Sequence, residues 1–258
     1  MATEAPGRVE GGARLTETPQ GHPLLSIIIV VFCDKDDLQD ILESIMPHKI
    51  QDLEIVVIDG GSRDGTVALL QSFGSRIDYW LSEPDSGIYN AMNKGLQFAR
   101  GQYILHLNAG DRLLMVPWQE LRKCAASRVD VICCRVLLDN SIQFISTTGV
   151  LSKIVNTWHH QGTFYRRTSH LGYNETYKVF GDFDLNQRLL KSGCIIANFD
   201  HVVANHNSDG LTAHITDNRE TYKIVRKNFG WPYILPARLR FRFLQLRSYL
   251  RQKAAPKS

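Results

Sequence analysis

The sequence lacks any apolar run long enough to cross a membrane. Its longest apolar stretch, Leu24–Cys33, has ten residues, whereas a membrane-spanning helix needs about 20. Residues 1–23 are rich in Gly, Pro, Thr and Glu and contain no apolar core, so they do not have the pattern of a secretory signal. We therefore expect residues 1–23 to form a disordered tail.

Cysteine is scarce, and its spacing excludes the common metal and redox motifs. The 258 residues include five cysteines, and no two of them have C-x-x-C spacing. An odd number of cysteines without such spacing is typical of a reducing compartment, where cysteines serve as small buried apolar side chains. This pattern predicts a cytoplasmic protein.

Three common catalytic motifs are also absent. No G-x-G-x-x-G follows the first predicted strand, and neither G-x-x-x-x-G-K-[ST] nor G-x-S-x-G occurs in the chain. These absences argue against a dinucleotide-dependent dehydrogenase, a P-loop NTPase and a hydrolase with a nucleophile elbow.

Acidic residues are missing from Thr221–Ser258, which carries ten Lys or Arg side chains. The rest of the chain has 20 basic and 26 acidic side chains, so the net charge of +4 combines an acidic body with a basic tail. An acidic body does not favour nucleic acid as a partner.

The basic C-terminal segment, residues 231–258, also has an amphipathic pattern. Apolar residues recur there at helical spacing with arginines on both sides, at Leu239, Phe243, Leu246 and Leu250. Such a helix is typical of an anionic membrane surface. We expect peripheral contact with the inner face of the cytoplasmic membrane through residues 238–251; a helix docked on the domain is the alternative.

The remaining sequence alternates between apolar runs and helical patterns. Runs typical of buried parallel strands occur at Leu25–Phe32, Leu53–Ile58, Ile77–Leu81 and Tyr103–Leu107. Helical spacing lies between them, at Asp34–Pro47, Thr66–Phe73 and Ile88–Ala99. This alternation predicts βαβ units in a doubly wound α/β fold. After about residue 110 the pattern loosens into a mixed half, with strands expected at Val129–Val136, Ser141–Thr147 and His160–Arg166 and a helix at Asp182–Lys191.

Acidic side chains follow the predicted strands. The segments after the four strands are residues 32–34, 59–62, 83–87 and 108–111, and each contains an aspartate. Ligands of open α/β sheets bind at the carboxyl ends of the strands. Carboxylates there can hold a divalent cation that neutralises a diphosphate.

Several ordered motifs resemble those of the family-2 glycosyltransferases, which have the GT-A fold. The resemblance is carried by SIIIVVF, EIVVIDGGSRDGT, SEPDSGIYNAMNKG and GQYILHLNAGDRLL, and further on by HQGTFYRR and YKVFGDFDLNQRLLKSG. It is strongest to the bacterial subgroup that builds capsule, exopolysaccharide or O-antigen units. The resemblance implies a GT-A domain over residues 24–230 with a mostly parallel central sheet and a mixed acceptor-side half.

The resemblance also assigns residues to the donor side. These are Phe32, Asp59, Asp85, Asn93 and Asp111. Asp111 belongs to the family's metal motif, so the resemblance implies Mg²⁺ or Mn²⁺ there. Two departures from the family pattern are visible: Asn108 and Gly110 replace the preceding motif acids, and Gly60 stands where a second acid often follows Asp59.

Three residues are assigned to catalysis or to the acceptor and diphosphate side. Asp182 occupies the place of the catalytic acid, which accepts the proton of the acceptor hydroxyl. Asp184 is its rival, although Arg188 four residues later offers an ion pair. His160 matches the subgroup's His-Gln pair.

Together these features predict an inverting glycosyltransferase. The donor would be a nucleotide-diphosphate sugar and the acceptor a saccharide, lipid-linked by resemblance. The alternatives are a non-catalytic scaffold subunit, which the altered metal motif favours, and a nucleotidyltransferase, which would need a Gly- and Arg-rich loop after the first strand.

Overall fold

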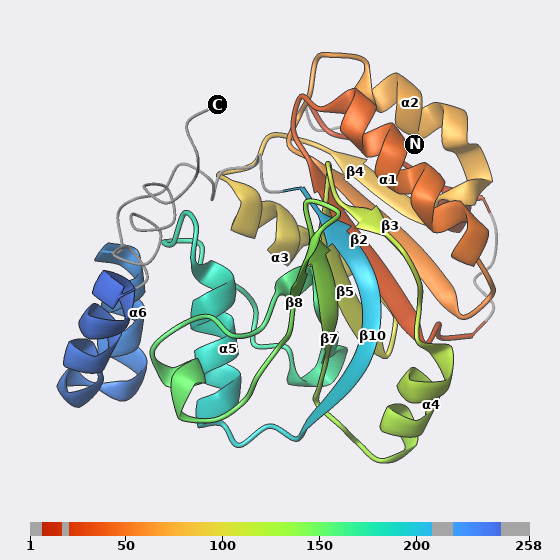
Figure 1. The fold of residues 1–258 in the computed structure, drawn as a ribbon. Helices are drawn as coiled ribbons and strands as arrows, with labels where there is room; N and C mark the ends of the chain where they lie inside the picture. Colours follow the sequence, from red (N-terminus) through yellow and green to blue (C-terminus); the bar gives the residue numbers. More distant parts are fainter. Residues whose placement is uncertain (1–6, 17–20, 208–218, 244–258) are drawn as a thin grey trace, which may run out of the picture.

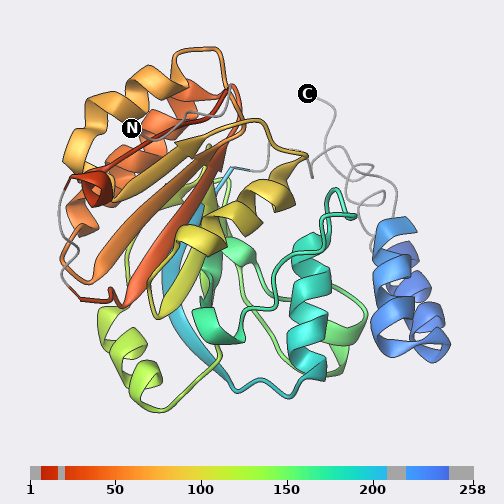
Figure 2. The same cartoon turned by 180° about the vertical axis from the view of Figure 1, so that it is seen from behind.

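The computed structural model describes residues 7–16, 21–207 and 219–243. Within these residues ten strands form one sheet in the order β1-β4-β3-β2-β5-β9-β7-β10-β6, with β8 added beside β7. Helices lie on both faces of this sheet (Figures 1 and 2). Its first half is parallel and consists of β2 (Leu25–Val31), β3 (Leu53–Asp59), β4 (Tyr79–Ser82) and β5 (Tyr103–Asn108). The predicted α/β fold is confirmed.

The second half of the sheet is mixed, as predicted. Antiparallel β9 (Thr163–Arg166) joins β5 to β7 (Val131–Leu138). The other strands around β7 are β8 (Ile142–Phe144), β10 (Ile196–His206) and the short β6 (Arg112–Leu113). The sequence pattern did not predict β10, because polar residues interrupt it and only its last part is deeply buried.

Helices cover both faces of the sheet. One face carries α1 (Lys35–Ile45), α2 (Thr66–Phe73) and α4 (Trp118–Ala126), and the other carries α3 (Ile88–Phe98) and α5 (Gly181–Lys191), with α6 (Arg219–Phe229) packed against α5. Strand β2 supplies both cores, since successive side chains of a strand point to opposite faces. Ile27 and Ile29 belong to the first cluster, and Ile28 and Val30 to the second.

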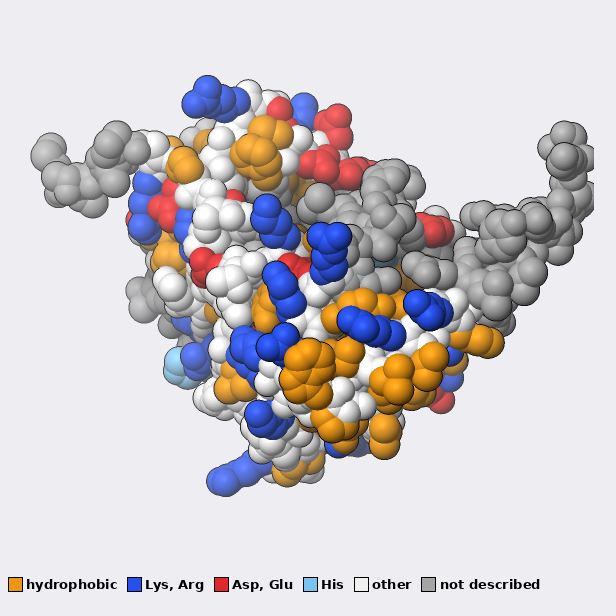
Figure 3. Space-filling view, turned by 90° about the vertical axis from the view of Figure 1, so that its left-hand side faces the viewer, with side chains coloured by type: hydrophobic (Ala, Val, Ile, Leu, Met, Phe, Trp, Pro, Cys, Tyr) orange, Lys and Arg blue, Asp and Glu red, His pale blue; other side chains and the backbone are white. Residues whose placement is uncertain are grey.

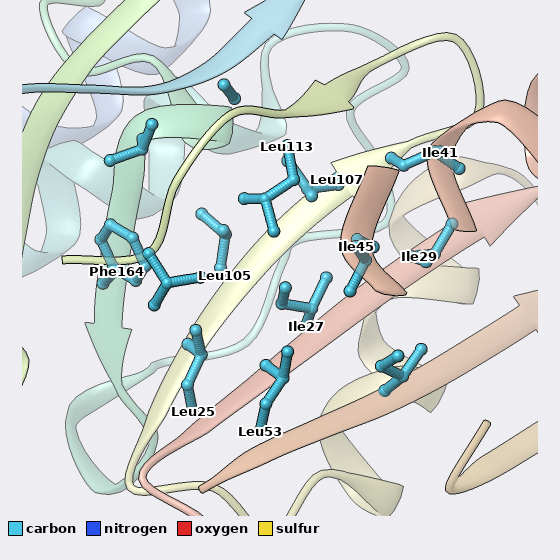
Figure 4. Close-up of a cluster of buried hydrophobic side chains, with 14 of the residues drawn as sticks. Leu25, Ile27, Ile29, Ile41, Ile45, Leu53, Leu105, Leu107, Leu113 and Phe164 are labelled. Carbon is cyan, nitrogen blue, oxygen red and sulfur yellow. The ribbon is translucent and has the colours of Figure 1, made fainter. Parts of the chain in front are cut away.

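Burial on both faces explains why β2 is a continuous apolar run, and the first core shows one of these faces. Ile41 and Ile45 of α1 lie over Ile27 and Ile29 of β2 (Figure 4), and all four side chains are fully buried. Burying one such side chain contributes about 1.5–3 kcal/mol. The sheet is therefore rigid where its carboxyl edge presents loops to solvent.

The N-terminal prediction is wrong over the described part of that segment. Val9–Gly11 forms β1, which pairs antiparallel with β4, and Ala13–Leu15 forms a 3₁₀ helix, η1. Gly11 is required there, because a Cβ would lie 2.4 Å from the indole ring of Trp80. The strand is too short to show a period, which is why composition alone suggested disorder. Residues 1–6 and 17–20 lie outside the described residues.

The C-terminal segment is described as far as residue 243. A 3₁₀ helix, η7 (Trp231–Tyr233), is followed by α-helix over residues 234–243. Ile234 and Ala237 are buried, so this helix packs on the domain with one side. The expected stripe residues Leu246 and Leu250 lie outside the described residues. In the described part of the chain, no helix has the length and apolarity needed to span a membrane.

Candidate functional site

A cavity of about 770 Å³ opens at the carboxyl edge of the sheet, and we call it the cleft. Its wall brings together five of the residues predicted from the sequence: Phe32, Asp85, Asp111, His160 and Asp182. These residues follow β2, β4, β5 and the acceptor-side segments, so the site lies where the rule for open α/β sheets places it.

Asp111 lies at the end of a tight turn after β5 and is almost fully buried. The backbone N–H of Asn108 donates to Asp111 Oδ2 at 2.7 Å, and the amide of Gln161 donates to the same oxygen at 3.0 Å. On the other side, His206 Nδ1 lies 2.7 Å from Asp111 Oδ1. The carboxylate is thus fixed in position at the floor of the cleft.

The surroundings of Asp111 fit a hard divalent cation. Asn108 Oδ1 and Gln161 Oε1 are buried and have no hydrogen-bond partner, and oxygen atoms are the ligands such cations prefer. The imidazole of His206 lies against the other oxygen of Asp111. Among the described residues, no group of three or more His, Cys, Asp or Glu side chains is placed to hold a metal. A cation here would depend on Asp111, on neutral oxygens and on the diphosphate itself.

Asp182 lies in the first turn of α5 and is held from several directions. Asn156 Nδ2 donates to Asp182 Oδ2 at 2.6 Å, and the backbone N–H of Phe183 donates to Oδ1 at 2.8 Å. Gly181 precedes it against the ring of Tyr89, where a Cβ would approach to 2.7 Å. The backbone N–H of Gly181 donates to the Tyr89 hydroxyl at 2.9 Å, so the start of α5 is fixed against α3.

His160 connects the two carboxylates across the cleft. Its Nδ1 lies 3.7 Å from Asp182 Oδ2, and its Nε2 lies 3.3 Å from the amide nitrogen of Asn108, the residue that bonds Asp111 through its backbone. Asp111 and Asp182 therefore belong to one constellation within one cavity.

Phe32 and Asp85 lie on the other wall. Phe32, the residue that follows the buried strand β2, is 66% exposed, and an exposed aromatic ring in a cavity is a stacking surface for a planar group. Asp85 packs over Gly60: a Cβ at that position would lie 2.7 Å from Asp85 Oδ2 and 3.0 Å from the Phe32 ring. Gly60 thus leaves room for Asp85 and Phe32, and an acid there would displace them.

Asp59, predicted to contact the donor, is not among the residues that line the cleft. Its side chain is fully buried. It accepts hydrogen bonds from the backbone N–H of Ser62 at 3.0 Å, from the Ser62 hydroxyl and from the Ser82 hydroxyl at 2.6 Å. Asp59 therefore holds the turn after β3, which is the common structural use of an aspartate in a turn.

Asn93 and Asp184 also lie outside the lining of the cleft and bond other parts of the protein. Asn93 exchanges hydrogen bonds with the backbone of Tyr173 and bonds Glu175, so it joins α3 to the segment before α5 rather than facing the cleft. Asp184 is fully buried and bonds Arg188 at 2.7 Å, the i,i+4 pair that the sequence offered as its alternative use. The structure thus separates Asp182, in the cleft, from Asp184, in the α5–α6 interface.

Comparison with known proteins decides the family. The sequence model described as "Glycosyl transferase family 2" matches residues 26–180 of the chain. This chain belongs to glycosyl transferase family 2. The match runs from β2 to the residue before α5, so it includes the donor-side wall and most of the cleft.

Curated relatives of this family member carry related names. A "PGL/p-HBAD biosynthesis glycosyltransferase" of Mycobacterium bovis is 29% identical over 215 residues, which cover 78% of this chain and 83% of the relative. An uncharacterised glycosyltransferase of Mycobacterium tuberculosis is 41% identical over 91 residues, 35% of each chain.

Solved structures confirm the GT-A-like fold of this family member. TarS of Staphylococcus aureus, residues 1–349 in complex with UDP-GlcNAc, aligns with a TM-score of 0.64 at 14% identity over 79% of this chain. The chain spans 64% of that protein, slightly less than two thirds. The mannosyltransferase PcManGT of Pyrobaculum calidifontis, in complex with GDP-Man and Mn²⁺, aligns with a TM-score of 0.61 at 15% identity over 85% of this chain and 69% of its own.

Three further side chains contact Asp111 or Asp182 and were not among the residues predicted from the sequence. Gln161 stands in the His-Gln pair and could have been found from it, whereas His206 and Asn156 belong to no quoted motif. His206 reaches Asp111 because β10 passes beside β7 and ends at the cleft, and this contact joins residues that are distant in sequence.

Proposed function

We propose that this glycosyltransferase moves a sugar from a nucleotide-diphosphate sugar to a hydroxyl of a saccharide or lipid-linked saccharide, with inversion at the anomeric carbon, in the building of a cell-surface polysaccharide. The observation that carries the proposal is the single cleft in which Asp111 and Asp182 are linked through His160 and Asn108. The complexes of TarS with UDP-GlcNAc and of PcManGT with GDP-Man support the donor class.

In this proposal Asp182 is the base. Asn156 and the Phe183 N–H fix its carboxylate, so an oxygen faces the cleft without rotamer freedom. Asp182 takes the proton of the acceptor hydroxyl as the acceptor oxygen forms its bond to the anomeric carbon. The bond from that carbon to the diphosphate oxygen breaks on the opposite face, so the configuration inverts and the electron pair leaves with the nucleoside diphosphate.

The donor would lie between Phe32 and Asp111. The exposed Phe32 ring offers a stacking face for the base, next to Asp85. Asp111, with Asn108 Oδ1 and Gln161 Oε1, would hold Mg²⁺ or Mn²⁺. When bound, such a cation neutralises charge that develops on the departing diphosphate. His160, between the carboxylates, orients Asp182 toward the acceptor.

The test is a donor screen with a stereochemical readout. UDP-, GDP- and dTDP-sugars are offered with lipid-diphosphate acceptors, product is detected by mass spectrometry, and its anomeric configuration is read by NMR. We expect transfer from one nucleotide class with inverted configuration. Retained configuration would contradict the single displacement. If no nucleoside diphosphate raises the melting temperature, with or without Mn²⁺, the non-catalytic alternative is correct.

A further inference from the structure

A row of apolar side chains faces outward on the C-terminal helical segment. Trp231 of η7 and Leu235, Leu239 and Phe243 of the helix after it are exposed by 67, 65, 58 and 56%. We call these four residues the apolar stripe. Their spacing of four places successive members on one side of a helix. Single exposed apolar residues are ordinary, but a row of four large ones marks an interaction surface.

The stripe is distinct from the side that holds this helix on the domain. Ile234 and Ala237 of the same helix are buried, and Ile234 joins the core cluster shared by α3, α5 and α6. Docking on the domain is therefore satisfied by one side, and the stripe remains on the other. The helix is therefore docked on the domain, which was the alternative interpretation of the sequence, and it also presents an apolar surface outward.

Basic side chains surround the stripe. Lys223 and Arg226 of α6 and Arg238 and Arg242 of the following helix are exposed, and no acidic residue occurs after Glu220. The Arg226 guanidinium lies 4.6 Å from the centre of the Trp231 ring, so a cation and the largest apolar ring of the stripe are presented together. Figure 3 shows this face of the molecule, where hydrophobic side chains gather beside Lys and Arg.

We propose that the apolar stripe and its basic border form a docking surface for an anionic lipid bilayer. Apolar side chains would enter the boundary between headgroups and acyl chains while the arginines and lysines contact lipid phosphates. A tryptophan at the edge of such a surface suits the interface, because its ring is apolar and its N–H is polar.

The charge pattern favours a bilayer over a second copy of this chain. A symmetric dimer through the stripe would bring two basic borders together without acids between them, and like charges at an interface oppose association. An anionic membrane provides the missing negative charge. The proposal is independent of the chemistry of the cleft, since none of the stripe residues lines it.

The surface nevertheless lies on elements connected to the cleft. The first turn of α6 carries Glu220, which bonds the backbone of residues 178–180 beside Asp182. Lys153 of η4 (Val150–Lys153) in turn lies 5.3 Å from the ring of Tyr233 in η7. A bilayer at the stripe would therefore lie next to the acceptor-side half of the enzyme.

The test is sedimentation with vesicles of phosphatidylcholine alone and of phosphatidylcholine with about one third phosphatidylglycerol. We expect the full chain to sediment only with the anionic vesicles. Replacing three of the four stripe residues by serine (Trp231→Ser, Leu235→Ser, Leu239→Ser) should lower the partition coefficient at least about tenfold, and Arg238→Gln with Arg242→Gln should lower it about threefold or more. The matched control, Leu15→Ser with Ile195→Ser, removes apolar side chains of similar exposure elsewhere and should sediment like the parent.

Three results would overturn the proposal. One is the absence of sedimentation with anionic vesicles at low salt. Another is equal sedimentation of the parent, the stripe variant and the control. The third is a parent protein that is a dimer by light scattering and does not sediment with vesicles, while the stripe variant is a monomer. That result would make the stripe an interface between copies of this chain. Because all substituted side chains are exposed, circular dichroism should show the parent fold in each variant.

Discussion

Glu220 offers a sharp test of how Asp182, the proposed base, is positioned. Its carboxylate accepts three consecutive backbone N–H groups, from Lys178 at 2.8 Å, Val179 at 3.0 Å and Phe180 at 2.8 Å. These residues line the cleft and lead directly into Asp182. Sequence analysis gave Glu220 no role, because the contact crosses about 40 residues.

The expected magnitude follows from these bonds. A hydrogen bond to a charged group contributes about 1.5–3 kcal/mol, and partial exposure of this segment reduces each value. Glu220→Ala removes all three bonds, so we expect a loss of about 3 kcal/mol in the interactions that hold residues 178–180. Glu220→Gln keeps one accepting oxygen and should lose about half of that.

The assay is transfer rate at saturating donor and acceptor. A misplacement of about 1 Å can cost about 10²-fold in rate, so we expect kcat to fall about 100-fold in Glu220→Ala and about tenfold in Glu220→Gln, with donor Kd within about twofold of the parent. The control is Glu43→Ala, an exposed glutamate of α1 far from the segment. A folded Glu220→Ala protein with the parent kcat would refute this reasoning.

Three further predictions concern stability and the donor wall. Gly60→Asp should weaken donor binding and lower stability by about 1–3 kcal/mol, because its Cβ would meet Asp85; tighter binding in a donor titration would contradict this. Asp59→Ala should lower the free energy of unfolding, measured by chemical denaturation, by about 2–4 kcal/mol, because it removes the acceptor of the Ser82 hydroxyl and of the turn at Ser62. A decrease under about 0.5 kcal/mol would argue against its structural role. Burial lowers the pKa of His170 to about 3, so the unfolded state takes up a proton first and stability falls as pH drops below about 6.5. His170→Phe should reduce that fall by about 1.4 kcal/mol per pH unit, and an unchanged slope would exclude His170 as its source.

The parallel half of the fold follows from local sequence. Its strands are continuous apolar runs and its helices have clear spacing and ends, so β2 to β5 and α1 to α3 lie within one or two residues of their expected bounds. By contrast, β1 is too short to show a period and β10 is interrupted by polar residues. Both strands are stabilised by pairing with strands that are distant in sequence, and the sequence of a single segment does not reveal its pairing partner.

The candidate site divides in the same way. Phe32, Asp85, Asp111, His160 and Asp182 line one cavity, and each was proposed from its place after a strand or at the start of a helix within a motif; their roles stay predictions. Asp59 ends a strand and Asp184 lies in the first turn of a helix, as the lining residues do, but they bond a turn and a helix interface; Asn93 lies in the middle of α3 and bonds a neighbouring segment. An aspartate that holds a turn and one that faces a ligand look alike in sequence. His206 could be recognised only from the three-dimensional path of β10.

We propose that Asp182 removes the proton of the acceptor hydroxyl, and that the donor is held on the other side of the cleft, around Asp111. The most direct measurement compares kcat and donor Kd for the parent, Asp182→Asn and the control Asp36→Asn, whose side chain is 93% exposed and pairs with the exposed Lys35. A positioned base contributes about 10²–10⁴-fold to rate. We expect kcat to fall by about 10²–10⁴-fold in Asp182→Asn, with the donor Kd unchanged, and kcat of the control to equal that of the parent. A parent-like rate in Asp182→Asn would contradict the proposal.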